Sequence, residues 1–171
     1  HNLGITGNIG DMPFRASIGY SNQEGILKTD GLNRLTGSLG FNPSFFEDHL
    51  RVNLNVKGMI INNQFGNRGA IGSAFSFDPT QPVYNGSPYG GYFTWVQQNG
   101  EPITIANMNP IAQLQMRDDQ STVQRSIGNA EFDYRFHFLP DLRANLNLGY
   151  DISTSEGSVN VPENAPWAFN S

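Results

Sequence analysis

Three histidines are the first candidates for site chemistry, because imidazole nitrogens bind metal ions and transfer protons. His1, His49 and His137 are far apart in the sequence and lack the short spacings that bring metal ligands together. The chain has no cysteine and therefore no thiolate ligand. We expect the three histidines to lie far apart in the fold as well, and we predict neither a metal site nor a cofactor.

Two carboxylates have a spacing that acid–base chemistry can use. Glu131 and Asp133 lie two residues apart and share one face of an extended strand. They alternate on that face with Asn129 and Arg135, which is typical of a solvated or cross-strand-paired surface. No serine has the Gly-x-Ser-x-Gly context of a nucleophile elbow. We therefore predict that the chain is not an enzyme.

Five aromatic residues form the one candidate contact site. They lie among glycines and prolines: Tyr84, Tyr89, Tyr92, Phe93 and Trp95. Flat rings in such a loop can stack on sugars or anchor the surface of a partner protein. They can equally pack the loop on itself or against the rim of the fold, as in many long structured loops. The sequence leaves these roles open.

The elements that must position these residues are β-strands. Between Gly128 and Asp151, apolar and polar residues alternate strictly on either side of a turn at 139–141, which predicts a β-hairpin. The same alternation recurs through the first third of the chain. The predicted strands are about 2–9, 14–21, 34–42, 50–60, 123–138 and 142–152. Their charged and amide face carries Arg15, Arg51, Asn53, Asn55, Lys57, Glu131, Asp133, Arg135, Asn145 and Asn147.

The segment from about 61 to 122 has no strand periodicity and is rich in Gly, Pro and aromatic residues, so we expect a long loop. A short helix is expected after Asn109, because Asn is a favoured N-cap and Pro110 suits the first helical position. After Ile152 the chain turns polar and contains Pro, and we expect another loop.

Composition supports an all-β fold. Hydrophobic residues make up 37% of the 171 residues, charged residues only 15%, and the mixture rich in Asn, Gly and Phe favours strands and turns. The net charge of −5 and the scattered Lys and Arg residues argue against nucleic acid as a partner. The chain begins at His1 without a signal peptide, so we expect it to be a piece of a longer protein.

The apolar face of these strands meets either lipid or a second sheet. Three alternating stretches, residues 50–60, 129–138 and 142–152, are each about 10 residues long, the length that a tilted strand needs to cross a bilayer. Short and long connections alternate, and aromatic residues gather near the strand ends, as in outer-membrane barrels. A soluble β-sandwich with its charges facing water predicts the same alternation but not the difference in loop lengths. We therefore expect the polar face to line a wet lumen, and because six strands cannot close a ring, we expect more strands in the whole protein.

Several motifs together resemble the early barrel region of SusC/RagA-type TonB-linked outer-membrane transporters. The order and spacing of these motifs extend over nearly the whole chain: residues 15–27, Arg34-Leu35-Thr36, Asp78-Pro79-Thr80, Pro82-Val83-Tyr84, Asn109-Pro110, residues 138–142 and residues 147–151. The resemblance implies a 22-stranded antiparallel transmembrane barrel with long extracellular loops, a plug, energy supply through TonB, and a SusD-like lipoprotein that captures oligosaccharides or peptides. It also implies that the plug and the TonB-contacting segment lie outside these residues.

The sequence thus predicts about six strands of a large barrel in the bacterial outer membrane. The expected function is import of oligosaccharides or peptides, with a SusD-like lipoprotein, the TonB complex and membrane lipid as partners. Two alternatives stay open: a secreted β-sandwich that binds glycans through residues 92–95, and a barrel-embedded hydrolase with an active-site Ser or His on a strand's outer rim.

Overall fold

The computed structural model describes residues 1–10, 12–139 and 141–168. The expected turns around Asp11 and Pro140 lie partly outside the described residues. The chain forms two compact units. We call them the sheet body (residues 1–22, 33–62 and 122–156) and the loop body (residues 23–32, 63–121 and 157–171).

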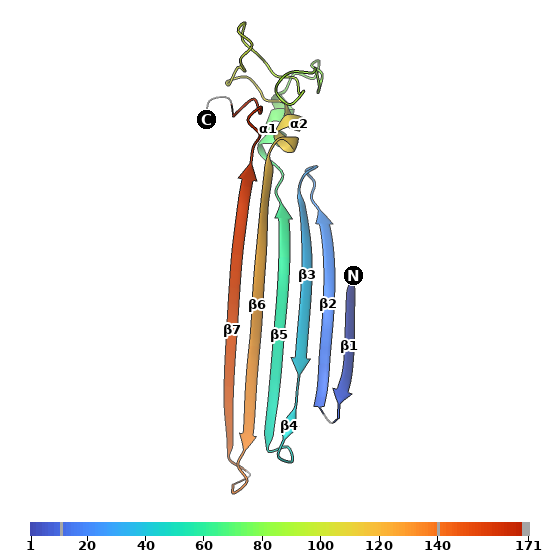
Figure 1. Ribbon diagram of the computed structural model, residues 1–171, viewed down its shortest axis with the longest axis vertical. Helices are drawn as coiled ribbons and strands as arrows, with labels where there is room; N and C mark the ends of the chain where they lie inside the picture. The colour runs from blue at the N-terminus through green and yellow to red at the C-terminus, as the bar shows by residue number, and fades with distance from the viewer. Residues whose placement is uncertain (11, 140, 169–171) are drawn as a thin grey trace. The chain divides into compact units, whose positions relative to one another are not determined.

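The sheet contains seven strands among the described residues, in the order β1-β2-β3-β5-β6-β7, with the short β4 paired to the start of β5 (Figure 1). Neighbouring strands run in opposite directions (Figure 1). The strands are β1 (Asn2–Ile9), β2 (Met12–Glu24), β3 (Gly31–Phe41), β4 (Ser44–Phe45), β5 (Leu50–Gln64), β6 (Asp118–Arg135) and β7 (Arg143–Asn160). The fold is therefore all-β and antiparallel with an up-and-down order, as the sequence predicts, and it is consistent with a segment of a β-barrel.

Register fixes the two faces of the sheet. Leu3 pairs with Ile18 and Thr6 pairs with Arg15, so apolar residues meet apolar residues across β1 and β2, and polar residues meet polar ones. On β2 and β3 the polar face continues, because the Ser17 and Ser38 hydroxyls form a hydrogen bond of 2.7 Å. Shifting one strand by a single residue would exchange its two faces completely. The period of two seen in the sequence thus determines both faces.

Every strand after β1 that the sequence predicted is longer than expected, and β2 already spans Met12–Glu24 instead of about 14–21. β5 continues to Gln64, β6 begins at Asp118 and ends at Arg135 instead of near 138, and β7 runs to Asn160 instead of ending near 152. Side-chain hydrogen bonds join the polar ends of β5 and β6, as from Asn63 Nδ2 to Ser121 Oγ at 3.1 Å. The polar composition after Ile152 predicts a loop. The residues instead continue strand β7, which pairs with β6 although this part of it has no apolar face.

The loop body is largely irregular but has a core. It contains α1 (Gly69–Ser76), which the sequence did not predict, and α2 (Pro110–Gln115), which begins where expected. Isolated bridges pair Tyr84 with Tyr92 and Val96 with Pro102. The core brings together α2, the aromatic segment and the chain after β7, through Tyr92, Ala112, Met116 and Ala165, with Ile111, Val161, Trp167 and Ala168 packed around them. No helix among the described residues is long and apolar enough to cross a membrane.

Candidate functional site

The polar face of the sheet is hollowed. A concavity of about 960 Å³ lies over β1, β2, β3, β5 and β6. Four of the predicted polar-face residues line it: Arg15, Asn53, Asn55 and Lys57. The side-chain amide of Asn55 donates to Asn53 at 2.7 Å, which is possible because residues two apart on a strand share a face. The structure thus brings these four side chains together, whereas Arg51 lies outside the lining.

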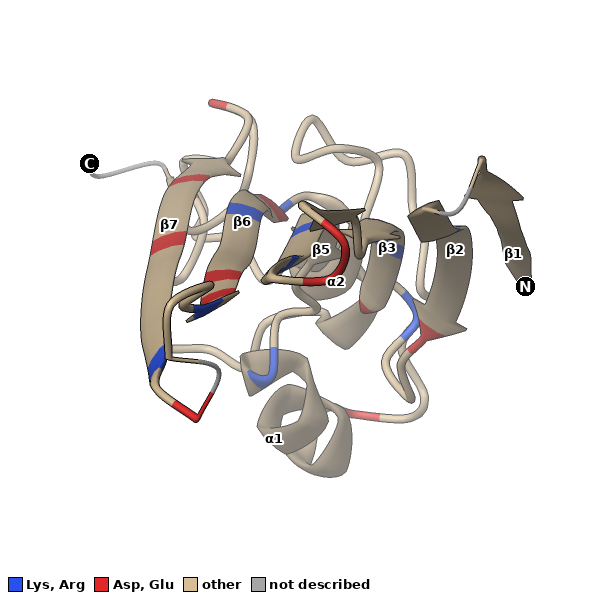
Figure 2. Cartoon of the chain, turned by 90° about the horizontal axis from the view of Figure 1, so that it is seen from below, with Lys and Arg blue, Asp and Glu red and all other residues tan. Residues whose placement is uncertain are grey.

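The carboxylates of the polar face lie on β6 and β7, where both signs of charge occur (Figure 2). Glu131 accepts a hydrogen bond from Asn145 Nδ2 at 2.9 Å, and Asp133 lies 3.9 Å from Arg143. A third pair joins Arg125 Nε to Asp151 Oδ1 at 2.9 Å. Every one of these contacts crosses from β6 to β7, as expected for a paired strand face. The remaining predicted polar-face residue of β7, Asn147, is exposed.

The histidine prediction was wrong in one respect. His49 and His137 are in contact, with ring centroids 3.8 Å apart and ring planes 11° from parallel. The rings meet because β5 and β6 are neighbours, so that the turn before β5 lies beside the end of β6. The Nδ1 atom of His49 is 2.9 Å from the carbonyl oxygen of Arg135, and the Arg135 amide donates to the His49 carbonyl at 2.7 Å.

The stacked histidines do not make a metal site. Face-to-face rings direct their nitrogens side by side and not toward one point. Within the described ranges, no group of three His, Asp or Glu residues could hold a metal ion. His137 instead contacts the Tyr134 hydroxyl through Nδ1 at 3.1 Å. One signal could have found this pair: both residues lie next to the short turns that the sequence places at the same end of the sheet.

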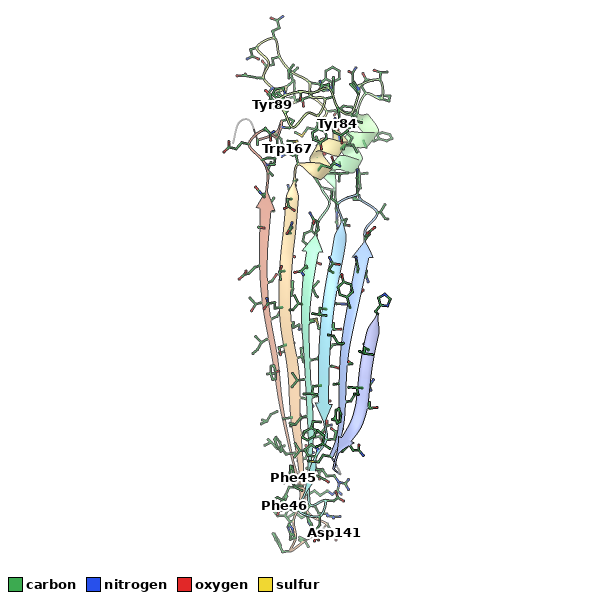
Figure 3. The ribbon with its side chains drawn as sticks, turned by 45° about the vertical axis from the view of Figure 1, so that its right-hand side comes forward. Phe45, Phe46, Tyr84, Tyr89, Asp141 and Trp167 are labelled. Atoms are coloured by element: carbon green, nitrogen blue, oxygen red, sulfur yellow. The ribbon has the colours of Figure 1, made fainter. Side chains whose placement is uncertain are left out.

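The turn before β5 has an unusual backbone. Phe46, Glu47 and Asp48 all have positive φ angles of 56°, 54° and 67°. A left-handed conformation costs roughly 1–2 kcal/mol for each residue other than glycine, so the surrounding contacts must hold this turn. Phe45 and Phe46 lie at the same end of the sheet as Asp141 (Figure 3). Phe136 and Phe138 are in ring contact near the same turns, so aromatic residues gather here as the sequence predicts.

The five loop aromatics differ widely in exposure. Tyr92 is buried (8% exposed), and its hydroxyl donates to Gln115 Oε1 at 2.5 Å. Burial raises the pKa of Tyr92, and the neighbouring Tyr84 adds to the shift. Tyr84 is 58% exposed, and its ring lies 5.0 Å from that of Tyr92. Of this pair, only Tyr84 presents a large part of its ring to a ligand.

The other three aromatics are half-buried. Phe93 meets Trp95 edge to face at 5.0 Å, and Phe77 meets Phe93 at 6.1 Å. The Tyr89 hydroxyl donates to the Gly100 carbonyl at 2.9 Å. Figure 3 shows Tyr84, Tyr89 and Trp167 within the loop body. Much of the predicted aromatic site therefore packs the loop on itself, which was one of the roles that the sequence left open.

Asn109 connects this aromatic segment to α2. Its Oδ1 atom accepts from the amides of Ile111 at 3.0 Å and Ala112 at 3.3 Å, which confirms the predicted N-cap. Its Nδ2 atom donates to the Val83 carbonyl at 2.8 Å. The side chain is 4% exposed, so both ends of one buried amide are satisfied. The hydrogen bond from Asn109 to Val83 was not predicted, because it joins residues 26 positions apart.

The chain matches no protein-family model. It does resemble two curated proteins. It is 37% identical to the TonB-dependent receptor SusC of Bacteroides thetaiotaomicron over 183 residues, which cover 99% of this chain and 18% of that receptor. It is 31% identical to the TonB-dependent receptor P26 of Formosa agariphila over 134 residues, which cover 77% of this chain and 12% of that receptor.

The similarity to SusC extends over practically the whole chain, including strands and loops, although the chain spans less than a fifth of that relative's length. Both relatives are named as TonB-dependent receptors. The resemblance noted in the sequence motifs is thereby confirmed, and the chain belongs to the SusC-type TonB-dependent receptors.

Proposed function

We propose that this chain forms part of the barrel wall of an outer-membrane importer driven through TonB. The observation that carries the proposal is the sheet's apolar face, which no other described segment of the sheet body covers. Its side chains remain strongly exposed on both outer strands, as at Leu3, Ile5, Leu146 and Leu148. Soluble proteins rarely leave a continuous apolar face of this size open to water. Lipid would cover it in a membrane, and the polar face would then line the transport path.

The cargo of the proposed importer is an oligosaccharide or a peptide, delivered with the help of a SusD-like surface lipoprotein. This part of the proposal rests on the relationship to the receptor named SusC. The TonB complex would act through N-terminal segments of the whole receptor. The function of this chain is then to provide a wall and part of an external loop, and it performs no bond chemistry.

The loop body suits the external side of such a receptor. Its core fixes the aromatic segment by internal contacts, and Tyr84 remains exposed for contact with cargo or with the lipoprotein. Rings held rigidly lose little side-chain entropy when a ligand binds. Tyr84→Ala is therefore expected to weaken cargo or lipoprotein binding several-fold, whereas Tyr92→Phe should mainly loosen the loop.

Extraction of the full-length protein from cells tests the membrane location. We expect it to stay with the outer membrane in buffer and to require detergent for release. Release into buffer without detergent would favour the second candidate, a secreted β-sandwich that binds glycans. Uptake by cells that lack the gene tests the transport function: loss of uptake of one oligosaccharide or peptide class is expected, and unchanged uptake of every class would contradict import.

A further inference from the structure

The apolar face of the sheet contains a concavity of about 470 Å³ over β3, β5, β6 and β7, which we call the outer hollow. Gly37 and Gly58 line it from the neighbouring strands β3 and β5 and contribute no side chain. Beyond the adjacent residues, a Cβ atom added at either glycine would meet no heavy atom within 4 Å. Large aliphatic side chains line the same hollow: Leu35, Ile60 and Ile152. The two glycines therefore leave a gap in an apolar surface.

The outer hollow opens on the face that the barrel would turn toward lipid. Ile152 and Thr154 lie an even number of residues after Leu148, so their side chains share the apolar face of β7. A plug, as the family resemblance implies, lies inside the barrel, on the other face of the wall. Further strands must join the sheet at its edge strands β1 and β7 to close the ring. Neither the plug nor the added strands would cover the outer hollow.

The lining of the outer hollow changes from apolar to polar toward the ends of β6 and β7 that continue into the loop body. Thr154 follows Ile152 on the same face of β7, and Gln124 contributes an amide from β6. The side chains of Gln124 and Thr154 have no hydrogen-bond partner in the described part of the chain. Ser126, in contrast, forms a hydrogen bond of 3.0 Å with the Tyr150 hydroxyl. Free amide and hydroxyl donors thus lie at one end of an apolar hollow.

The charge at this end of the outer hollow is compensated. Arg125 also belongs to the lining, but its Nε and Nη2 atoms both donate to the carboxylate of Asp151. A phosphate would therefore find no unpaired cation among the described lining residues. The carbonyl oxygen of an ester or amide needs only neutral donors, which Gln124 and Thr154 supply.

The size and the composition of the outer hollow together indicate its ligand. Its volume lies within the range of about 300–1,000 Å³ that is usual for sites of small molecules. Apolar walls exclude a sugar or a peptide backbone, because their polar groups would lose hydrogen bonds to water without replacement. A hydrocarbon chain with a carbonyl group at one end fits both parts of the lining.

We propose that the outer hollow binds one acyl chain of an outer-leaflet lipid, with the ester or amide linkage of that chain at Gln124 and Thr154. The proposal rests on the proposed membrane location and deepens it, because it assigns a specific lipid site within a face that otherwise contacts lipid without preference. It predicts that lipid resides at the outer hollow more often than at other positions on the apolar face.

Photocrosslinking of the full-length receptor in nanodiscs tests the proposal. The nanodiscs consist of dioleoylphosphatidylcholine with a small fraction of phosphatidylcholine that carries a diazirine in one acyl chain. Mass spectrometry then compares adducts per residue in two regions, the outer hollow at 58–60 and 152–154 and the remaining apolar face at 146–148. Adducts should be about fivefold more frequent in the outer hollow, the preference that one or two net hydrogen bonds provide.

Three variants separate the two parts of the proposed site. Gly37→Ile/Gly58→Ile fills the outer hollow with apolar side chains, so the ratio of adducts should fall to about one. This variant should fold, because β-branched residues suit a strand better than glycine does. Gln124→Leu removes a donor and should lower the ratio about twofold to threefold. Ala144→Ile adds similar bulk to the apolar face outside the outer hollow and should leave the ratio unchanged.

Equal labelling of the two regions in the wild-type receptor would overturn the proposal, as would an unchanged ratio in Gly37→Ile/Gly58→Ile. Weaker labelling at the outer hollow than at 146–148 would also overturn it, since a protein surface such as a second receptor copy would then cover the hollow. Equal labelling contradicts only the specific lipid site. An absence of adducts from both regions would contradict the lipid-facing sheet as well, and with it the proposed membrane location.

Discussion

The sheet body and the loop body distribute their apolar side chains in opposite ways. Among the described residues, the buried aliphatic, aromatic and methionine side chains all belong to the loop body except Pro43 and Val52. The sheet body contains far more strand but leaves its apolar residues exposed, as at Leu3, Leu146 and Leu148. The loop body therefore carries its own core, whereas the sheet body depends on surroundings that cover its apolar face.

The two bodies therefore owe their stability to different sources: contacts within the chain in the loop body, and an external apolar medium in the sheet body. In the loop body, contacts within the chain bury apolar surface, so its order should not depend on lipid. In the sheet body, hydrogen bonds between strands and an external apolar medium must act together, since isolated sheets with an open apolar face are poorly stable in water. Substitutions on the two sides of one strand should then have very different effects.

The largest effect is expected from a charge on the apolar face. Leu148→Arg should destabilise the full-length receptor by about 2–4 kcal/mol, because a guanidinium in the middle of a bilayer costs this much. Asn147→Arg, one residue earlier on the opposite face, should have little effect. Urea titration of the receptor folded in lipid measures both free energies. Equal destabilisation by the two variants would contradict the assignment of the faces.

The next effect concerns the loop body. Asn109→Ala removes the cap of α2 and the bond to Val83, and should cost about 1–2 kcal/mol locally. Asn109→Asp keeps an acceptor for the α2 amides but loses the donor to Val83. Hydrogen exchange should rise in both 83–93 and 110–116 for the alanine variant, but mainly in 83–93 for the aspartate variant. An identical exchange pattern in the two variants would mean that the lost bond to Val83, which both share, explains the role of Asn109 without the cap.

A smaller effect is expected at the hydrogen bond between Ser17 and Ser38 on the polar face. A double-mutant cycle with Ser17→Ala and Ser38→Ala should give a coupling of about 0.5–1 kcal/mol, the usual net contribution of one partly buried hydrogen bond. Stability of the receptor in lipid is again the measured quantity. Zero coupling would show that the two hydroxyls are solvated independently, as they would be in a sheet of different register.

The smallest effect is a pH dependence within the loop body. The backbone amide of Thr80, its hydroxyl and Gln81 hold the pKa of Asp78 below its usual range. Since the folded pKa is the lower one, this contribution to loop stability is complete above about pH 4 and is lost as pH falls through the folded value. Hydrogen exchange at residues 78–81 should therefore rise in acid, and Asp78→Asn should remove that rise. A rise of the same size in the variant would assign the effect to another group.

The success of prediction from sequence depends on how far apart in the chain the interacting residues lie, in both units. The faces of the sheet and the N-cap at Asn109 were predictable, because they depend on residues one to four positions apart. The pairing of Glu131 and Asp133 with β7 followed from the hairpin. By contrast, the stack of His49 on His137 joins residues 88 positions apart, and only the combination of strand order and turn positions, not a local pattern, brings them together.

The loop body was the least predictable part of the chain. Helix α1 contains four polar or glycine positions among its eight residues and lacks a side-chain cap, so local signals for it are weak. The extension of β7 to Asn160 has no alternation of apolar and polar residues and forms because β6 offers it a partner. In each case contacts distant in sequence decide the structure.

Site-directed spin labelling of the full-length receptor in lipid tests the central claim most directly. Labels at Phe132 and Leu146 should be accessible to oxygen, which concentrates in lipid, and protected from a water-soluble nickel complex. Labels at Asp133 and Asn147, one residue further along the same strands, should show the reverse. Contact with the nickel complex at all four positions, or protection from both reagents at Phe132 and Leu146, would contradict a lipid-facing sheet.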